Sequence, residues 1–268
     1  MGRLDDRIAI VTGASRGIGA AIATRLASEG ATVAVAARTT EETEGGLAGT
    51  IHQVVEAITR AGGKALAVPT NLASGDDRAR LVATVERELG PPDILVNNAA
   101  VTYFLPSATF PRKRYDLMFE VQVWTAMELA QLVLPQMIEN GRGWIVNISS
   151  KAALHPHGPP FNPRVAFGTV YGMCKAALER FSTGLAAEVY DSGIAVNALS
   201  PTQVVPTPGV MFHGLIPAGK EADAEPVEVM AEAALELTSG NPKELTGRIC
   251  YSQDLLAELG VTVAAGAR

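Results

Sequence analysis

Short apolar runs alternate along the chain with longer segments in which apolar residues recur at helical spacing. The first run, apolar and partly β-branched at 8–11, ends at a glycine. A pattern of alanine, isoleucine and leucine then continues to Leu26, Gly30 ends it, and a second apolar run begins at Thr32. This order predicts a β-α-β unit, whose two parallel strands require a right-handed crossover.

The same alternation continues through the chain. Further strands are predicted at 64–70, 93–99, 143–149, 194–201 and 247–251, and helices at 74–89, 112–140, 170–190 and 226–239. Ser74 stands where a residue that caps the first of these helices is expected. Because the strand runs are apolar throughout and helices separate them, they indicate a parallel sheet buried on both faces. We expect one α/β domain over residues 1–268, with a doubly wound, mostly parallel seven-stranded sheet and helices on both faces.

The composition and net charge of the chain indicate which classes of partner it can bind. Hydrophobic residues make up 47% of the chain and charged residues 19%, as in an ordinary globular protein. The net charge of -6 argues against nucleic acid or an anionic membrane as a partner, so an anionic ligand would need local basic residues. No apolar run approaches the roughly 18 residues of a membrane span. With two cysteines and no signal-peptide pattern, we expect a cytoplasmic protein.

A glycine-rich segment, "TGASRGIG" at 12–19, follows the first strand and opens the first helix. Glycine allows positive φ, and it lets backbone N–H groups and a helix N-terminus approach a pyrophosphate. A plain tight turn is the alternative. The strand before it and the β-α-β spacing favour a dinucleotide site.

The end of the second strand indicates which nicotinamide cofactor binds. NAD usually meets an acidic residue there, whereas an arginine suits the 2′-phosphate of NADP. This chain has Ala37 and then Arg38, with Arg16 in the glycine loop. Two guanidinium groups offer paired donors to a phosphate, so NADP(H) is favoured over NAD(H). The alternative is that both arginines are solvated surface charges.

Tyr171 and Lys175 stand four residues apart in a predicted helix and therefore share one face. A nearby ammonium favours the phenolate form of a tyrosine, which can then exchange a proton with an alcohol or carbonyl. A hydroxyl such as that of Ser150 could hold the same substrate oxygen. Taken alone, this tyrosine and lysine spacing occurs by chance in many helices.

Together with the glycine loop, the pair resembles the short-chain dehydrogenase/reductase family over essentially the whole chain. The matching segments are "TGASRGIG", "NNAA" at 97–100, "NISS" at 147–150, "YGMCK" at 171–175 and "NALSP" at 197–201. The resemblance implies a Rossmann fold, nicotinamide-dependent oxidoreduction of an alcohol or carbonyl, and Ser150, Tyr171 and Lys175 as the catalytic set. The cofactor-binding set that it implies is Gly13, Ser15, Arg16, Gly17, Ile18, Gly19, Arg38, Asn71, Leu72, Asn98, Ala99, Ala100, Tyr171, Lys175, Pro201 and Val204.

Four positions depart from the family pattern. Gln122 stands where an asparagine commonly helps to bind a water near the lysine, and we include it in the catalytic set. Asn71 replaces an aspartate that faces the adenine, Thr202 replaces a glycine, and Ala100 replaces another. Gln122 and Thr202 motivate an alternative function, a nucleotide-binding sensor or scaffold with a decayed active site.

A fifth departure is the lengthened loop at about 151–170, which separates Ser150 from Tyr171 by 20 residues. Because closure entropy grows slowly with loop length, we expect the two hydroxyls still to meet. The loop then lies beside the substrate, where His155, His157, Phe161 and Phe167 line a pocket, or else it is a surface loop at an oligomer contact. With no complementary ligand cluster beside the two histidines, we expect no metal.

Pocket walls are also expected from Tyr103, from Phe104 and from the residues at 210–216, within a substrate loop at about 202–225. Their apolar character favours a small hydrophobic carbonyl or alcohol substrate. The long 151–170 loop and "GTIHQVVEAI" at 49–58 are similar to hydroxysteroid-dehydrogenase-like and citronellol-dehydrogenase-like members of the family. Helices such as the one carrying "KAALERFSTGLAAEV" are apolar on several sides, and the resemblance therefore implies a homodimer or homotetramer.

Overall fold

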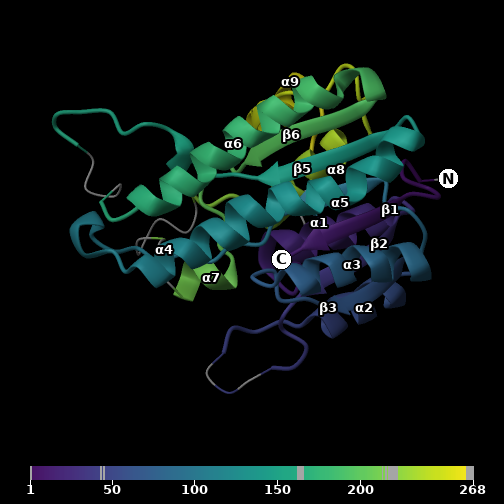
Figure 1. Ribbon diagram of the computed structural model, residues 1–268, viewed down its shortest axis with the longest axis horizontal. Coiled ribbons are helices and arrows are strands. Elements are labelled where there is room, and N and C mark those ends of the chain that lie inside the picture. Colours follow the sequence, from purple (N-terminus) through teal and green to yellow (C-terminus); the bar gives the residue numbers. More distant parts are fainter. Residues whose placement is uncertain are drawn as a thin grey trace.

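All seven predicted strands form one sheet. The computed structural model describes residues 2–42, 44, 46–161, 166–212, 214, 216 and 223–263. The strands are β1 (Ile8–Thr12), β2 (Thr32–Ala37), β3 (Lys64–Pro69), β4 (Ile94–Asn97), β5 (Gly143–Ile148), β6 (Ile194–Ser200) and β7 (Ile249–Tyr251). They pair in parallel in the order β3-β2-β1-β4-β5-β6-β7. The predicted doubly wound sheet is confirmed (Figure 1).

Helices cover both faces of the sheet. They are α1 (Gly17–Ser28), α2 (Ile51–Arg60), α3 (Gly75–Glu88), α4 (Arg112–Phe119), α5 (Thr125–Glu139), α6 (Thr169–Val189), α7 (Pro208–Phe212), α8 (Val227–Ser239) and α9 (Ser252–Glu258). Apolar residues of α1, α2, α8 and α9 form one core layer, and those of α3, α5 and α6 form the other. Successive residues of β1 point to opposite layers, Val11 to the first and Ile10 to the second. This explains why the strand runs are apolar throughout.

The helix predicted over 112–140 is not continuous. A π-helical turn, Glu120–Trp124, separates α4 from α5. The Thr125 hydroxyl lies 2.9 Å from the carbonyl oxygens of both Glu120 and Leu72, which fixes the turn against the loop after β3. Such turns are frequent at functional sites, and this one carries Gln122.

The stretch Arg112–Glu139 is also the one described segment long and apolar enough, by length and composition, to cross a membrane. Its α5 part contributes Leu129, Val133 and Met137 to the core layer shared with α3 and α6. It therefore packs as a core helix of the domain.

Three helices, α2, α7 and α9, were not predicted. α7 lies within the segment read as an irregular loop after β6, and α9 follows the last strand. The two cysteines, Cys174 and Cys250, are free thiols buried in different parts of the core.

Candidate active site

A cavity of about 810 Å³ lies at the carboxyl edge of the sheet. Because all strands are parallel, the loops that follow them meet at this edge. The predicted site residues that line the cavity are Gly13, Ser15, Arg16, Gly17, Ile18, Arg38, Asn71, Leu72, Asn98, Ala99, Ala100, Ser150, Tyr171, Lys175, Pro201 and Val204. Of the predicted set, Gly19 and Gln122 lie outside the lining.

The glycine loop between β1 and α1 forms one end of the cavity. Gly13 has a φ of +63°, and a Cβ there would lie 2.8 Å from the Cα of Ala99. Gly19 lies behind the loop, where a Cβ would lie 2.4 Å from Nδ2 of Asn98. That amide group donates to the carbonyl oxygens of Thr12 and Gly13, at 2.9 and 3.2 Å, and so joins the loop to the end of β4. The N-terminus of α1, which has no side-chain cap, is thus held open to the cavity and fits a pyrophosphate.

Both arginines predicted to bind a phosphate line this end of the cavity. Burial lowers the pKa of Arg16, and the neighbouring charge of Arg38 lowers it further. Arg16 also donates to the carbonyl oxygens of Ala48 and Gly49, at 2.8 and 2.7 Å, which ties the loop before α2 to the glycine loop. Arg38 is exposed at the end of β2, directly after Ala37. The two guanidinium groups are therefore neighbours that repel each other, while the Glu42 carboxylate offsets part of the charge at Arg16.

The loop after β3 carries two more predicted residues, Asn71 and Leu72. Asn71 is exposed, and its Oδ1 accepts a hydrogen bond from the Ala73 N–H at 3.3 Å. Leu72 is buried, and its carbonyl oxygen accepts from the buried guanidinium of Arg78 at 2.6 Å. Arg78 also pairs with Glu120 and Glu128, so it connects this loop to the π-helical turn.

Ser150 and Tyr171 meet despite the long loop between them. Ser150 follows β5, Tyr171 lies in the first turns of α6, and the hydroxyl groups form a hydrogen bond. Lys175 is buried one helical turn further along α6. Its Nζ donates to the carbonyl oxygen of Ile148 at 2.8 Å and lies 5.5 Å from the centroid of the Tyr171 ring. The three predicted catalytic side chains are therefore together in the wall of the cavity.

Burial dominates the ionisation of this group. It raises the pKa of Tyr171, and the hydrogen bond with Ser150 acts in the opposite direction. Burial also lowers the pKa of Lys175 to about 8, while the Glu179 carboxylate, which itself accepts from the Ser149 hydroxyl at 2.7 Å, raises it. The tyrosine is thus a phenol near neutral pH, and the phenolate form that we expected from the nearby lysine is wrong for this structure, because burial raises the pKa of Tyr171.

Gln122 lies behind the cavity wall. It is 2% exposed, and its Nε2 donates to the carbonyl oxygen of Val101 at 2.9 Å, while Val101 itself lines the cavity. The Oε1 atom is buried and has no hydrogen-bond partner within the described part of the chain. The amide group therefore acts on the site through the Val101 segment.

The long loop contributes differently from our expectation. His155, His157, Phe161 and Phe167 are exposed, and none of them lines the cavity. Lys151, its first residue, lines the cavity instead. No group of three or more potential metal ligands occurs among the described residues. Of the other expected walls, Tyr103, Phe104 and Val210 line the cavity, whereas residues 213 and 215 lie outside the described residues.

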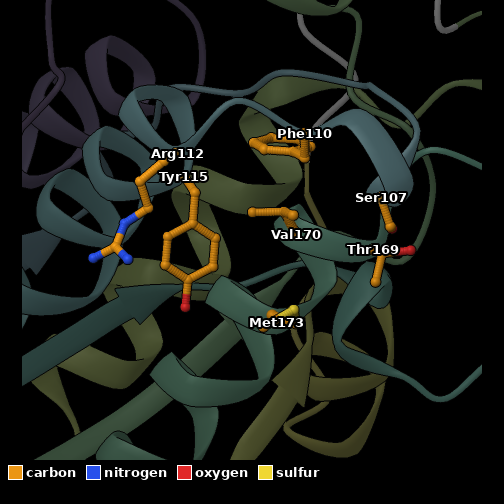
Figure 2. A pocket seen from close by; sticks show the side chains of 7 residues that line it. All are labelled: Ser107, Phe110, Arg112, Tyr115, Thr169, Val170 and Met173. Carbon is orange, nitrogen blue, oxygen red and sulfur yellow. The ribbon is translucent and has the colours of Figure 1, made fainter.

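A second cavity, of about 510 Å³, lies on the far side of the first turn of α6. Figure 2 shows Val170 at its centre, with Tyr115 and Arg112 of α4 on one side and Ser107 and Thr169 on the other. Its lining comes from α4, α6 and the segment before α4, and does not include Ser150. Sequence analysis gave no sign of it, because its walls come from short segments brought together by packing.

Sequence analysis also missed the buried carboxylate of Glu225, which is 1% exposed. It accepts hydrogen bonds from the N–H groups of Thr202 and Gln203, at 3.0 and 3.1 Å, and from the hydroxyl of Ser252 and the side-chain amide of Gln253. Thr202, which we noted as a departure, accepts through Oγ1 from the Gln253 N–H at the start of α9. Glu225 therefore clamps the two ends of the substrate loop together.

Comparison with known protein families gives a match to the short chain dehydrogenase model over residues 7–212. Among curated proteins, the chain is 32% identical over 245 residues to the ketoacyl reductase HetN of Nostoc sp., with 91% of this chain and 79% of that protein covered. It is also 32% identical over 260 residues to human hydroxysteroid dehydrogenase-like protein 2. That alignment covers 97% of this chain but only 60% of the human protein, so the chain spans less than two thirds of that relative.

Two similar solved structures are also of a dehydrogenase and an oxidoreductase. A putative dehydrogenase from Xanthomonas campestris superimposes with a TM-score of 0.83 at 32% identity, covering 98% of this chain and 92% of that one. A metagenomic short-chain oxidoreductase in complex with NADP superimposes with a TM-score of 0.76 at 29% identity, covering 93% and 98%. The similarity thus includes both the fold and the segments that form the cavity.

Proposed function

Because the chain belongs to the short-chain dehydrogenase/reductase family and is an NAD(P)-dependent oxidoreductase, we propose that it interconverts an alcohol and a carbonyl on a hydrophobic small molecule, with NADP(H) as cofactor. The observation that carries this proposal is the meeting of Ser150, Tyr171 and Lys175 in the wall of a cavity that also contains the glycine loop. The apolar walls supplied by Tyr103, Phe104 and Leu117 favour a hydrophobic substrate.

In the direction of reduction, Tyr171 gives its phenolic proton to the carbonyl oxygen, which becomes the hydroxyl of the alcohol. Ser150 holds the same oxygen and stabilises the charge that develops on it. The Lys175 ammonium then stabilises the phenolate left on Tyr171. Gln122 positions the Val101 segment of the wall. A bound NADPH would supply the hydride, which forms the new C–H bond and leaves NADP⁺.

The preference for NADP(H) rests on Arg16 and Arg38. Their mutual repulsion would be relieved by a 2′-phosphate between them, and β2 ends at Ala37 rather than at a carboxylate that could hold the ribose hydroxyls of NAD. One similar protein was solved in complex with NADP. NAD(H) with the same chemistry is the alternative.

We further propose a cytoplasmic homodimer or homotetramer. Exposed apolar side chains of α5 and α6, Met127, Ile138 and Met173, lie on the outer faces of two helices and favour a second copy as their cover. The chemistry does not depend on this assembly, because the catalytic set comes from one chain.

The test follows nicotinamide absorbance with hydrophobic aldehydes, ketones and alcohols, using both cofactors and the Tyr171→Phe variant. Turnover with NADPH that is lost in the variant supports the enzyme. Tight NADPH binding without any turnover would support the sensor, whose motivation is Gln122 and Thr202.

A further inference from the structure

The charge of the main cavity is opposite to that of the protein. Its described lining contains four cationic side chains and no aspartate or glutamate, although the chain as a whole carries a net charge of -6. The four are Arg16, Arg38, Lys151 and Lys175. The proposed function uses three of them, two for the cofactor phosphate and one for Tyr171. Lys151 has no role in it.

Lys151 lies at the opposite end of the cavity from the arginines. Arg38 follows β2, whereas Lys151 follows β5, three strands away in the sheet order, which corresponds to about 14 Å. Its Nζ lies 5.4 Å from the ring centroid of Tyr251, at the end of β7, further still from β2. A dinucleotide phosphate held by Arg38 is therefore remote from the Lys151 ammonium.

The position of Lys151 is well defined by its neighbours. It directly follows Ser150, whose Oγ accepts from the Ala152 N–H at 3.2 Å and caps the turn Lys151–Ala153. The Ala152 carbonyl oxygen is so close to α6 that a Cβ on Gly172 would lie 2.6 Å from it. The backbone of Lys151 is thus fixed between the catalytic serine and the catalytic helix.

No carboxylate forms an ion pair with Lys151 within the described residues. The nearby Glu179 carboxylate accepts from Ser149 and acts on Lys175. The Tyr251 ring attracts the ammonium by a cation–π interaction, which holds it without neutralising it. The Glu179 and Asp254 carboxylates both act on Tyr251, but neither forms an ion pair with Lys151, which directly follows Ser150 and lines the cavity. The Lys151 ammonium is therefore suited to bind an anion there.

Resting on the proposed function, we infer that Lys151 binds a carboxylate of the substrate, so that the substrate is a keto acid or hydroxy acid with an apolar body. A single ammonium matches the single negative charge of a carboxylate, whereas phosphate is usually held by several donors or by arginine forks. The apolar walls at Tyr103, Phe104 and Val204 accommodate the rest of the molecule. Lys151 is then a specificity-determining residue.

The test compares apolar keto acids of several chain lengths with their methyl esters, which keep the ketone and lose the charge. With NADPH, the natural protein is expected to prefer the acid, mainly through KM. In Lys151→Met, kcat/KM for the acid should fall about ten- to hundredfold, because a charge-assisted hydrogen bond is lost. The value of kcat/KM for the ester should not change. Lys113→Met, an exposed lysine outside the cavity, is the matched control.

A second readout is direct binding of the hydroxy acid product to the protein with NADP⁺, by calorimetry. We expect the hydroxy acid to bind more weakly to Lys151→Met than to the natural protein. We also expect its affinity for the natural protein to fall as the salt concentration rises. Equal preference for acid and ester, or equal losses on both in the variant, would overturn the inference while leaving the oxidoreductase intact. A rise in the Kd of NADPH would show instead that Lys151 binds the cofactor. Absence of Tyr171-dependent turnover on every compound would contradict the proposed function itself.

Discussion

The ammonium of Lys175 lies against the ring of Tyr171, with Nζ 5.5 Å from the ring centroid, while it donates to the Ile148 carbonyl oxygen at 2.8 Å. Lys175 is buried and Tyr171 is half-buried, and burial shifts their two pKa values in opposite directions, that of tyrosine upward and that of lysine down to about 8. The pair therefore holds its protons near neutral pH in a form suited to protonating a carbonyl.

The rate of carbonyl reduction should fall as the pH rises through about 8. Below that pH Lys175 is an ammonium and can stabilise the phenolate that Tyr171 becomes, whereas above it the lysine is neutral. In Glu179→Gln the loss of the carboxylate lowers the pKa of Lys175, so the decline in kcat should begin at lower pH. Glu188→Gln, at an exposed position of the same helix, should leave the profile unchanged. A decline at the same pH in both variants would contradict a role for Glu179.

Reversing the charge of Arg38 should separate the two cofactors. In Arg38→Glu the Kd of NADPH is expected to rise at least about tenfold, because a charge-assisted contact to the 2′-phosphate is replaced by repulsion. The Kd of NADH should stay the same or fall. Fluorescence titration measures both, and Arg87→Glu on the exposed side of α3 is the control. Unchanged NADPH affinity would refute the assignment of the 2′-phosphate to Arg38.

Glu225→Met should loosen the substrate loop. The variant removes the Oε2 atom that accepts from the N–H groups of both Thr202 and Gln203, so both groups lose this acceptor. We expect a loss of about 1–3 kcal/mol in the free energy of unfolding and faster proteolysis between 202 and 225. Glu228→Met, exposed on α8, should show neither effect. Proteolysis at the natural rate would mean that Glu225 does not restrain the loop.

Gln122→Met removes an amide group while keeping the volume of the side chain. The Val101 carbonyl oxygen then loses its donor, and the wall segment that it belongs to loses its fixed position. We predict a fall of about tenfold in kcat with the Kd of NADPH unchanged, since Gln122 does not line the cavity. Gln131→Met, exposed on α5, is the control. A change in the Kd of NADPH without a change in kcat would contradict a role of Gln122 in positioning the Val101 segment.

The elements with strong local signals were predicted from sequence. Apolar runs gave all seven strands, and Ser74 caps α3 by accepting from the Asp77 N–H, as its position indicated. The meeting of Ser150 and Tyr171 was also predicted, because strand end and helix start are fixed by the sheet whatever the length of the loop between them.

The features that sequence could not give depend on tertiary packing. The π-helical turn at Glu120–Trp124 follows the same helical periodicity as its neighbours, and only contacts to Leu72 and Arg78 distinguish it. Which residue of the long loop reaches the cavity depends on the path of the chain, and that path brings in Lys151 and leaves out Phe161. The Glu225 clamp joins residues about 25 positions apart, for which no local pattern exists.

In the proposed mechanism, Tyr171 transfers the proton in an NADPH-dependent reduction. The most direct measurement is the steady-state rate of NADPH oxidation by the natural protein and by Tyr171→Phe, with a hydrophobic ketone and with NADPH binding measured in parallel. Loss of the phenolic hydroxyl should lower kcat about 10²- to 10⁴-fold and leave the Kd of NADPH within a small factor. A variant that binds NADPH equally and turns over at the natural rate would contradict the account.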